Sequence, residues 1–245
     1  MKNINFDIEN NIIPFVPKVC FFHIEKCMGS SLRSSFYNYF KEIYDISEIF
    51  DPEVNNSNNL ISRIDLLNIY NKKYKIILSH CSFNKEGVTD YFSRKCFSIT
   101  CIREPIKRFI SHYYFFDIKM YNKNIQEFSK EDLIKLLISL GNIQVWRLSG
   151  ETNSLDITLN NIKLINCILI QENINEDFIY LNKILNTKFN VNNILILNNI
   201  NVSTIDYKQF NDYDFLKNNY YEYFNDDYIL YNSVISMDIN ERIKL

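Results

Sequence analysis

The chain has 245 residues, of which 47% are hydrophobic, 15% aromatic and 23% charged, and its formal net charge is −2. This length and apolar content suffice for one large domain or two small ones with a sizeable core. The near-neutral charge, without an excess of clustered Lys and Arg, excludes a typical nucleic-acid-binding surface. No apolar run reaches the roughly 18 to 20 residues of a membrane span, and the N-terminus has no apolar segment of a secretory signal, so we expect neither.

The cysteines do not form a recognisable metal site or disulfide framework. None lies in a CxxC pair or at zinc-ligand spacing; they are Cys20, Cys27, Cys81, Cys96, Cys101 and Cys167. Several lie in apolar runs, where Cys behaves as a small hydrophobe. We therefore expect reduced thiols in a cytoplasmic protein and no bound metal.

The order of apolar patterns along the chain indicates its fold class. Residues 1–17 are expected to be a lead-in, followed by a single domain over residues 18–245. Short apolar runs predict buried strands at 19–24, 75–80, 96–102 and 166–171. Helical spacing predicts helices at 30–42, 60–71, 105–116, 129–141, 154–164 and 176–185, and the last two flank the last strand. Residues 215–235 are expected to form one or two helices. Strands that alternate with helices predict an α/β domain with a central parallel sheet flanked by helices.

The loop after the first strand, "EKCMGSS" (25–31), has the composition of an anion-binding loop. In parallel sheets, ligands bind beyond the carboxyl ends of the strands, where the loops after residues 24, 80 and 102 should gather. Gly29 allows close backbone approach, Ser30 and Ser31 begin a helix whose amides favour an anion, and Lys26 adds positive charge. The Walker A pattern GxxxxGK[ST] is absent, and a plain strand-to-helix turn is the alternative.

A second segment, "TCIREPIKRFISHYYFF" (100–116), suits a second phosphate. Arg103 stands at the exit of a predicted strand, Pro105 opens a helix, and Ser111 lies on that helix. The guanidinium group of Arg can bind a phosphate through two hydrogen bonds at once. The alternative is that Arg103 pairs with a surface carboxylate and Ser111 faces solvent.

Taken together, these two segments resemble the signature of the sulfotransferases. "FHIEKCMGSSL" resembles their 5′-phosphosulfate loop, commonly HIPKTGGTS, and "IREPIKRFISHYYFF" resembles their 3′-phosphate segment, R-[DE]-P-x-x-R-x-x-S-x-Y. "KIILSHCSF" and "GNIQVWRLSG" are similar to two further blocks, and the resemblance covers about residues 18–235. It is closest to the carbohydrate sulfotransferases that include the heparan sulfate 2-O-sulfotransferases.

The resemblance implies a P-loop-like three-layer domain and a sulfate donor. The donor would be 3′-phosphoadenosine 5′-phosphosulfate (PAPS), which leaves as 3′,5′-ADP (PAP), and the reaction needs no metal. By position, the 5′ part of the donor would be bound by Lys26, Cys27, Gly29, Ser30 and Ser31. The 3′-phosphate would be bound by Arg103 and Ser111.

This sequence departs from the family pattern at several positions. Cys27 replaces a Thr, and Met28 replaces a first Gly, so Met28 needs a backbone conformation that tolerates a side chain. Glu25 replaces a Pro and brings negative charge to the loop, which weakens anion binding unless its side chain points away or pairs with Lys or Arg. In the "GNIQVWRLSG" block, Trp146 falls where Arg is usual, and Arg147 comes one residue later.

Transfer of a sulfuryl group to a hydroxyl requires an in-line approach, a base, and positive charge near the leaving oxygen. Lys26 suits the leaving oxygen. His80 ends a predicted strand and matches the base of the 2-O-sulfotransferase-like family, so we expect it to be the base; a histidine that only shapes the loop is the alternative. His112, Glu25 and Glu104 are the other candidates for the base.

The sequence therefore predicts a bacterial O-sulfotransferase that uses PAPS and acts on a hydroxyl of an acceptor, with a carbohydrate expected. The alternatives are a sulfotransferase for a lipid, a small metabolite or a protein tyrosine, an inactive nucleotide-binding relative, and an ATP-dependent kinase, which the missing Walker A loop disfavours. Trp146, the only Trp, either stacks on a sugar ring or packs in the core, and we expect the core.

Overall fold

A computed structural model describes residues 17–51, 74–83, 95–115, 129–198, 210 and 212–245. Within them, the chain forms a five-stranded parallel sheet with the strand order β2-β3-β1-β4-β5. The strands are β1 (Val19–Phe22), β2 (Ile49–Phe50), β3 (Ile76–Ser79), β4 (Phe97–Ile102) and β5 (Cys167–Ile170). The four strands expected from apolar runs are confirmed, each one or a few residues shorter than predicted, and β2 is an addition.

The central position of β1 explains its apolar sequence. It pairs with β3 on one side and β4 on the other, with Val19 opposite Ile76 and Phe97. All residues of β1, β4 and β5 are buried. Strands of a parallel sheet covered on both faces need such continuous apolar runs, because neither face meets water.

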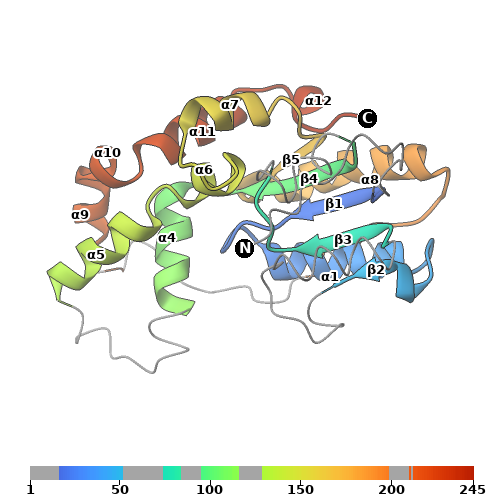
Figure 1. The fold of residues 1–245 in the computed structure, drawn as a ribbon, viewed down its shortest axis with the longest axis horizontal. Coiled ribbons are helices and arrows are strands. Elements are labelled where there is room, and N and C mark those ends of the chain that lie inside the picture. Colours follow the sequence, from blue (N-terminus) through green and yellow to red (C-terminus); the bar gives the residue numbers. More distant parts are fainter. Residues whose placement is uncertain (1–16, 52–73, 84–94, 116–128, 199–209, 211) are drawn as a thin grey trace, which may run out of the picture.

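Two layers of helices enclose the sheet (Figure 1). On one side lie α1 (Gly29–Phe40) and α8 (Ile174–Phe189), joined by the stacked rings of Phe36 and Phe178. The other layer contains α6 (Ile143–Leu148), α7 (Leu155–Asn161) and α11 (Asn225–Ile235). These layers confirm the predicted three-layer α/β architecture.

A smaller hydrophobic cluster extends from one end of the sheet, around Phe109, Leu137 and Phe224. It is built by α4 (Pro105–Tyr113), α5 (Lys130–Leu140), α9 (Tyr213–Asn218) and α10 (Tyr220–Tyr223). Gly141 ends α5, and a Cβ there would lie 1.9 Å from the backbone oxygen of Tyr223. A glycine is therefore required where α5 and α10 meet.

The expectation of one or two helices over 215–235 is wrong, because α9, α10 and α11 are three helices separated at Asn219 and Phe224. The short α12 (Ile239–Arg242) then brings the C-terminus back to β5, where Ile243 forms an antiparallel bridge with Cys167. Two 3-10 turns, η2 (Ile46–Glu48) and η5 (Gln171–Asn173), complete the elements. The helix predicted at 60–71 and nearly all of the lead-in at 1–17 lie outside the described residues.

All six cysteines lie in the described part of the chain, where they are buried and form no disulfide. None of the described helices is long and apolar enough to cross a membrane.

Candidate active site

Three loops meet at the carboxyl edge of the sheet and bring together residues that are far apart in the sequence. Nδ1 of His80, at the end of β3, lies 3.1 Å from the carbonyl oxygen of His23, at the end of β1. At the end of β4, Arg103 donates from Nη1 to the carbonyl oxygen of Lys26, at 3.0 Å. The predicted meeting of the loops after β1, β3 and β4 is therefore observed.

The loop between β1 and α1 has the backbone of an anion-binding turn. Lys26 and Met28 both adopt left-handed conformations, with φ of 65° and 57°, so Met28 has the unusual backbone that its sequence position demanded. The first helical hydrogen bond of α1 joins the Leu32 N–H to the Met28 carbonyl, and Met28 makes no side-chain cap. The backbone amides of residues 29–31 therefore precede the helical ladder, where an anion can accept from them.

Gly29 is needed at this loop for a reason that the sequence did not reveal. A Cβ at Gly29 would lie 1.3 Å from Nε2 of His23, so the absence of a side chain makes room for the imidazole ring. The His23 ring in turn stacks on the His80 ring, with 3.6 Å between their centroids. Burial, and then the neighbouring charge of His80, lower the pKa of His23 well below its ordinary value, so His23 is neutral.

The surroundings of His80 fix both its tautomer and its protonation state. Nδ1 donates its hydrogen to the His23 carbonyl, which leaves Nε2 of the neutral ring as a proton acceptor. A carboxylate oxygen of Glu25 lies 3.9 Å from Nδ1. Burial lowers the pKa of His80 and Arg147 adds to that effect, while Glu25 opposes it; the net pKa lies below the ordinary value. His80 is therefore neutral at pH 7.

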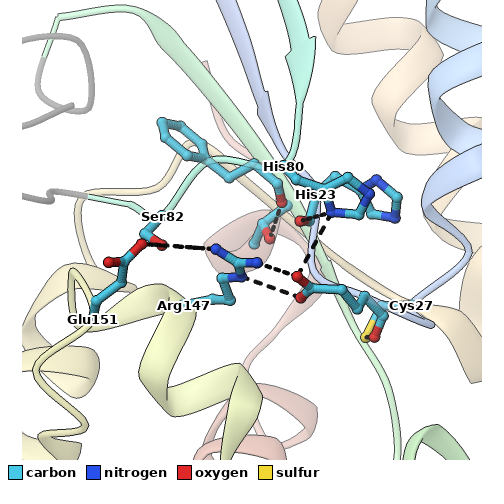
Figure 2. A network of polar contacts seen from close by, with 9 residues as sticks. His23, Cys27, His80, Ser82, Arg147 and Glu151 are labelled. Atoms are coloured by element: carbon cyan, nitrogen blue, oxygen red, sulfur yellow. Dashed lines mark hydrogen bonds and ion pairs between the residues drawn. The ribbon is translucent and has the colours of Figure 1, made fainter. Parts of the chain in front are cut away.

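Glu25 and Arg147, two of the departures from the sulfotransferase pattern, contact each other. Both carboxylate oxygens of Glu25 accept hydrogen bonds from the guanidinium group of Arg147. Arg147 also donates to Ser82 at 3.3 Å, and Ser82 donates to Glu151 at 2.8 Å. Figure 2 shows Arg147 between Ser82 and Glu151 on one side and His80 with His23 on the other. The negative charge of Glu25 is thus compensated beside the anion loop.

Arg147 sets the charge state of Glu25. Burial works to raise the pKa of Glu25, but the hydrogen bonds and charge of Arg147 outweigh it and hold the pKa below its ordinary value. The ion pair is largely buried, since the side chains of Arg147 and Glu25 are 6% and 20% exposed. Glu25 is therefore a carboxylate at neutral pH.

Arg103 is held by a buried amide. Its backbone N–H donates to Oε1 of Gln144 and its carbonyl accepts from Nε2, both at 2.9 Å. Gln144 also donates to Asp227, whose pKa burial raises to about 6. Arg103 and Ser111 are both buried, so the alternative in which Ser111 faces solvent is wrong.

The chain matches the model of the Sulfotransferase family over residues 13–226 of its 245 residues. It belongs to the sulfotransferase family. A comparison with curated proteins found no match. Family membership implies an enzyme that transfers a sulfuryl group to a hydroxyl-bearing acceptor, and sulfotransferases generally take that group from PAPS. The expected family is confirmed at this level.

The groups that the sequence predicts to bind the donor have chemistry that would suit PAPS. Backbone amides at the start of α1 and the cation of Lys26 suit a phosphosulfate, and the buried guanidinium of Arg103 suits a phosphate. The ammonium of Lys26 lies 3.8 Å from the centroid of the Phe115 ring, which holds it near the loop. Cys27 differs: it is buried, its N–H donates to Ile24, and its Sγ contacts Gln144 at 3.6 Å. These contacts let Cys27 shape the loop, and its predicted contact with the donor stays a prediction.

Sequence reasoning missed several residues of this site. Ser82 and Glu151 extend the network around Arg147, and Asp227 holds the N-terminus of α6 through the amides of Gln144 and Val145. The unusual Glu25 and the displaced Arg147 were the available signal for a compensating pair, although sequence reasoning considered each of them separately. Across the described residues, no three His, Cys, Asp or Glu side chains gather as metal ligands would.

The expectation that Trp146 packs in the core is wrong. Its side chain belongs to neither hydrophobic cluster of the described residues and is only partly buried. One face of its ring contacts the Arg147 guanidinium, whose Cζ lies 4.7 Å from the ring centroid.

Proposed function

We propose that this sulfotransferase transfers the sulfuryl group of PAPS to a hydroxyl of a carbohydrate, as the heparan sulfate 2-O-sulfotransferase-like enzymes do, with His80 as the base. Residues 18–245 act as one catalytic domain. The observation that carries the proposal is the position of His80. Its Nδ1 is held by the His23 carbonyl, its Nε2 is left as an acceptor, and its loop adjoins those of Lys26 and Arg103.

Each residue has one task in this mechanism. PAPS, when bound, supplies a sulfuryl group whose bond to the phosphate oxygen breaks while a bond to the acceptor oxygen forms. Nε2 of His80 takes the proton of the acceptor hydroxyl as this occurs. Lys26 compensates the negative charge that develops on the leaving phosphate oxygen. Arg103 and Ser111 hold the 3′-phosphate, and the amides of residues 29–31 hold the 5′ side.

The other candidates for the base are less suited to the task. Glu25 is engaged in its ion pair with Arg147. Glu104 caps α4 through the backbone amide of its third residue. Burial lowers the pKa of His112 to about 4, so it is a weaker base than His80 is expected to be. These features support His80.

Thermal unfolding with nucleotides tests the donor. 3′,5′-ADP at about a hundred times its Kd should stabilise the fold by roughly 2.7 kcal/mol, which is on the order of 5 to 10 °C for a chain of this size. 5′-AMP and Mg-ATP should give smaller shifts because they lack the 3′-phosphate. No shift with 3′,5′-ADP, or a larger one with Mg-ATP, would contradict the proposed donor.

Substitution of His80 tests the base. His80→Ala should lower the rate of sulfate transfer by about 10² to 10⁴-fold and leave the stabilisation by 3′,5′-ADP intact. His112→Ala is the matched control, and it should retain most of the activity. A His80→Ala enzyme with near-normal transfer would refute the assignment of the base.

Transfer assays with neutral glycans, lipids, phenols and tyrosine peptides identify the acceptor class.

A further inference from the structure

A cavity lies at the corner between α5 and α6, and the mechanism above does not use it. Its volume is about 240 Å³. The residues that line it come from the end of α5, from α6 and from the turn after α6: Ile138, Ser139, Asn142, Ile143, Trp146 and Asn153. Small-molecule sites in proteins usually combine an apolar or aromatic lining with a few fixed polar groups, as this lining does.

The polar groups of the cavity are oriented by bonds to the backbone. Asn142 accepts with Oδ1 from the Asp227 N–H at 3.1 Å, so its NH₂ group supplies donors; within the described part of the chain it makes no other side-chain hydrogen bond. Ser139 donates from Oγ to the Leu136 carbonyl at 2.9 Å, so its lone pairs supply acceptors. Asn153 is exposed and adds an amide with both functions. Hydrogen-bond donors next to hydrogen-bond acceptors can bind two neighbouring hydroxyl groups of one molecule, because each hydroxyl can both donate and accept.

The apolar part of the cavity is aromatic and accessible. Trp146 is partly exposed and its ring is braced by the Arg147 guanidinium, 4.7 Å from its centroid. Ile138 beside it is 73% exposed. An aromatic ring with a polar rim can pack against the C–H face of a sugar while amides bind its hydroxyls. The lining side chains carry no charge, which suits a neutral ring better than a uronate or a sulfated one.

We propose that this cavity binds a neutral sugar unit of the acceptor glycan, at a distance from the unit that receives the sulfate. This inference rests on the proposed carbohydrate acceptor. The side chains connect the cavity to the base: Trp146 contacts Arg147, Arg147 pairs with Glu25, and Glu25 lies 3.9 Å from His80. Because this pair lies between Trp146 and His80, the ring in the cavity is a neighbouring unit, and the cavity selects longer acceptors.

Trp fluorescence tests this proposal, because Trp146 is the only Trp in the chain and all Trp emission comes from it. The probes are neutral cello-, manno- and chito-oligosaccharides, with heparin-derived oligosaccharides as the acidic comparison. At least one neutral series should change the Trp emission in a saturable way and protect the ring from acrylamide quenching. No saturable change with any neutral probe, or an equal change with the acidic ones, would overturn the proposal.

Two asparagines form a matched pair of variants. Asn153 and Asn190 are both exposed and both left-handed, with φ of 55° and 53°, but only Asn153 lines the cavity. Asn153→Ala should weaken the saccharide Kd about tenfold and raise KM for long acceptors while kcat stays near normal. Asn190→Ala should change neither, and equal effects of the two variants would refute the site.

The test separates this inference from the proposed function. Stabilisation by 3′,5′-ADP reports on the donor site and does not involve Trp146. If 3′,5′-ADP stabilises the protein and no saccharide perturbs Trp146, the cavity proposal alone is wrong. If saccharides bind and 3′,5′-ADP does not, the saccharide site stands and the proposed donor is wrong.

Discussion

Substitution of Glu25 by Gln should destabilise the protein, because it removes the charge that compensates Arg147. Removing one partner of a buried ion pair typically costs 3 to 5 kcal/mol. Here the Glu25 side chain is 20% exposed, Arg147 keeps Ser82 and a Glu151 oxygen at 3.8 Å, and Gln still accepts one hydrogen bond. We therefore expect a loss of about 2 to 3 kcal/mol, which is a decrease in Tm of about 5 to 10 °C.

The assay is thermal unfolding at several pH values, with Glu48→Gln as the control. Glu48 pairs with Lys75, but their side chains are 31% and 34% exposed, and such surface pairs contribute at most about 1 kcal/mol. The pKa of Glu25 is lowered in the folded protein, so its contribution is present above the ordinary pKa of about 4.3. It is lost as the pH falls through the lowered pKa, where the wild-type and variant curves should converge.

Equal effects of Glu25→Gln and Glu48→Gln on Tm at pH 7 would refute this reasoning. A second readout concerns the proposed base, His80. The charge of Glu25 raises the pKa of His80 while burial and Arg147 lower it, so Glu25→Gln should lower that pKa further. The acidic limb of the pH–rate profile should then move to lower pH. A shift to higher pH would contradict the described electrostatics.

Three further substitutions test other parts of the structure. Gly29→Ala places a Cβ 1.3 Å from Nε2 of His23, and we expect it to lower the Tm by about 6 °C or more and to reduce transfer; a normal Tm would contradict the packing. Arg103→Ala should weaken stabilisation by 3′,5′-ADP more than stabilisation by adenosine 5′-phosphosulfate, and equal weakening would refute the 3′-phosphate role. Arg242→Met leaves the fully buried Asp177 without its two 2.9 Å hydrogen bonds, so urea unfolding should show a loss of about 3 to 5 kcal/mol; a loss below about 1 kcal/mol would show that the pair contributes little.

The sheet was predictable because its strands are short, apolar and separated by helical patterns. Residues 97–102 and 167–170 are strands close to the predicted bounds, since a continuous apolar run has no other stable place in an α/β domain. The cap of α5 at Ser129 and the first residue of α4, Pro105, are local signals too, and both were found from the sequence. The division of 215–235 into three helices was not, because no proline or glycine marks the breaks at Asn219 and Phe224.

The site was predictable as a set of loops but not as a set of contacts. The positions of Lys26, His80 and Arg103 followed from strand ends meeting at one edge of a sheet. The pairing of Glu25 with Arg147 joins residues 122 positions apart and depends on where α6 lies relative to the loop after β1. Periodicity and spacing carry no information on such pairs, so each departure from the family pattern looked like a defect when it was considered alone.

The stack of Gly29, His23 and His80 limits how this enzyme can be re-engineered. Exchange of the loop that begins with Lys26 for one of different donor preference would alter the surface on which the His23 ring rests. That ring supports the His80 ring, and the His23 carbonyl orients it. A graft that changes the nucleotide accepted would therefore also disturb His80, so if His80 is the base as proposed, donor choice and turnover are coupled at this loop.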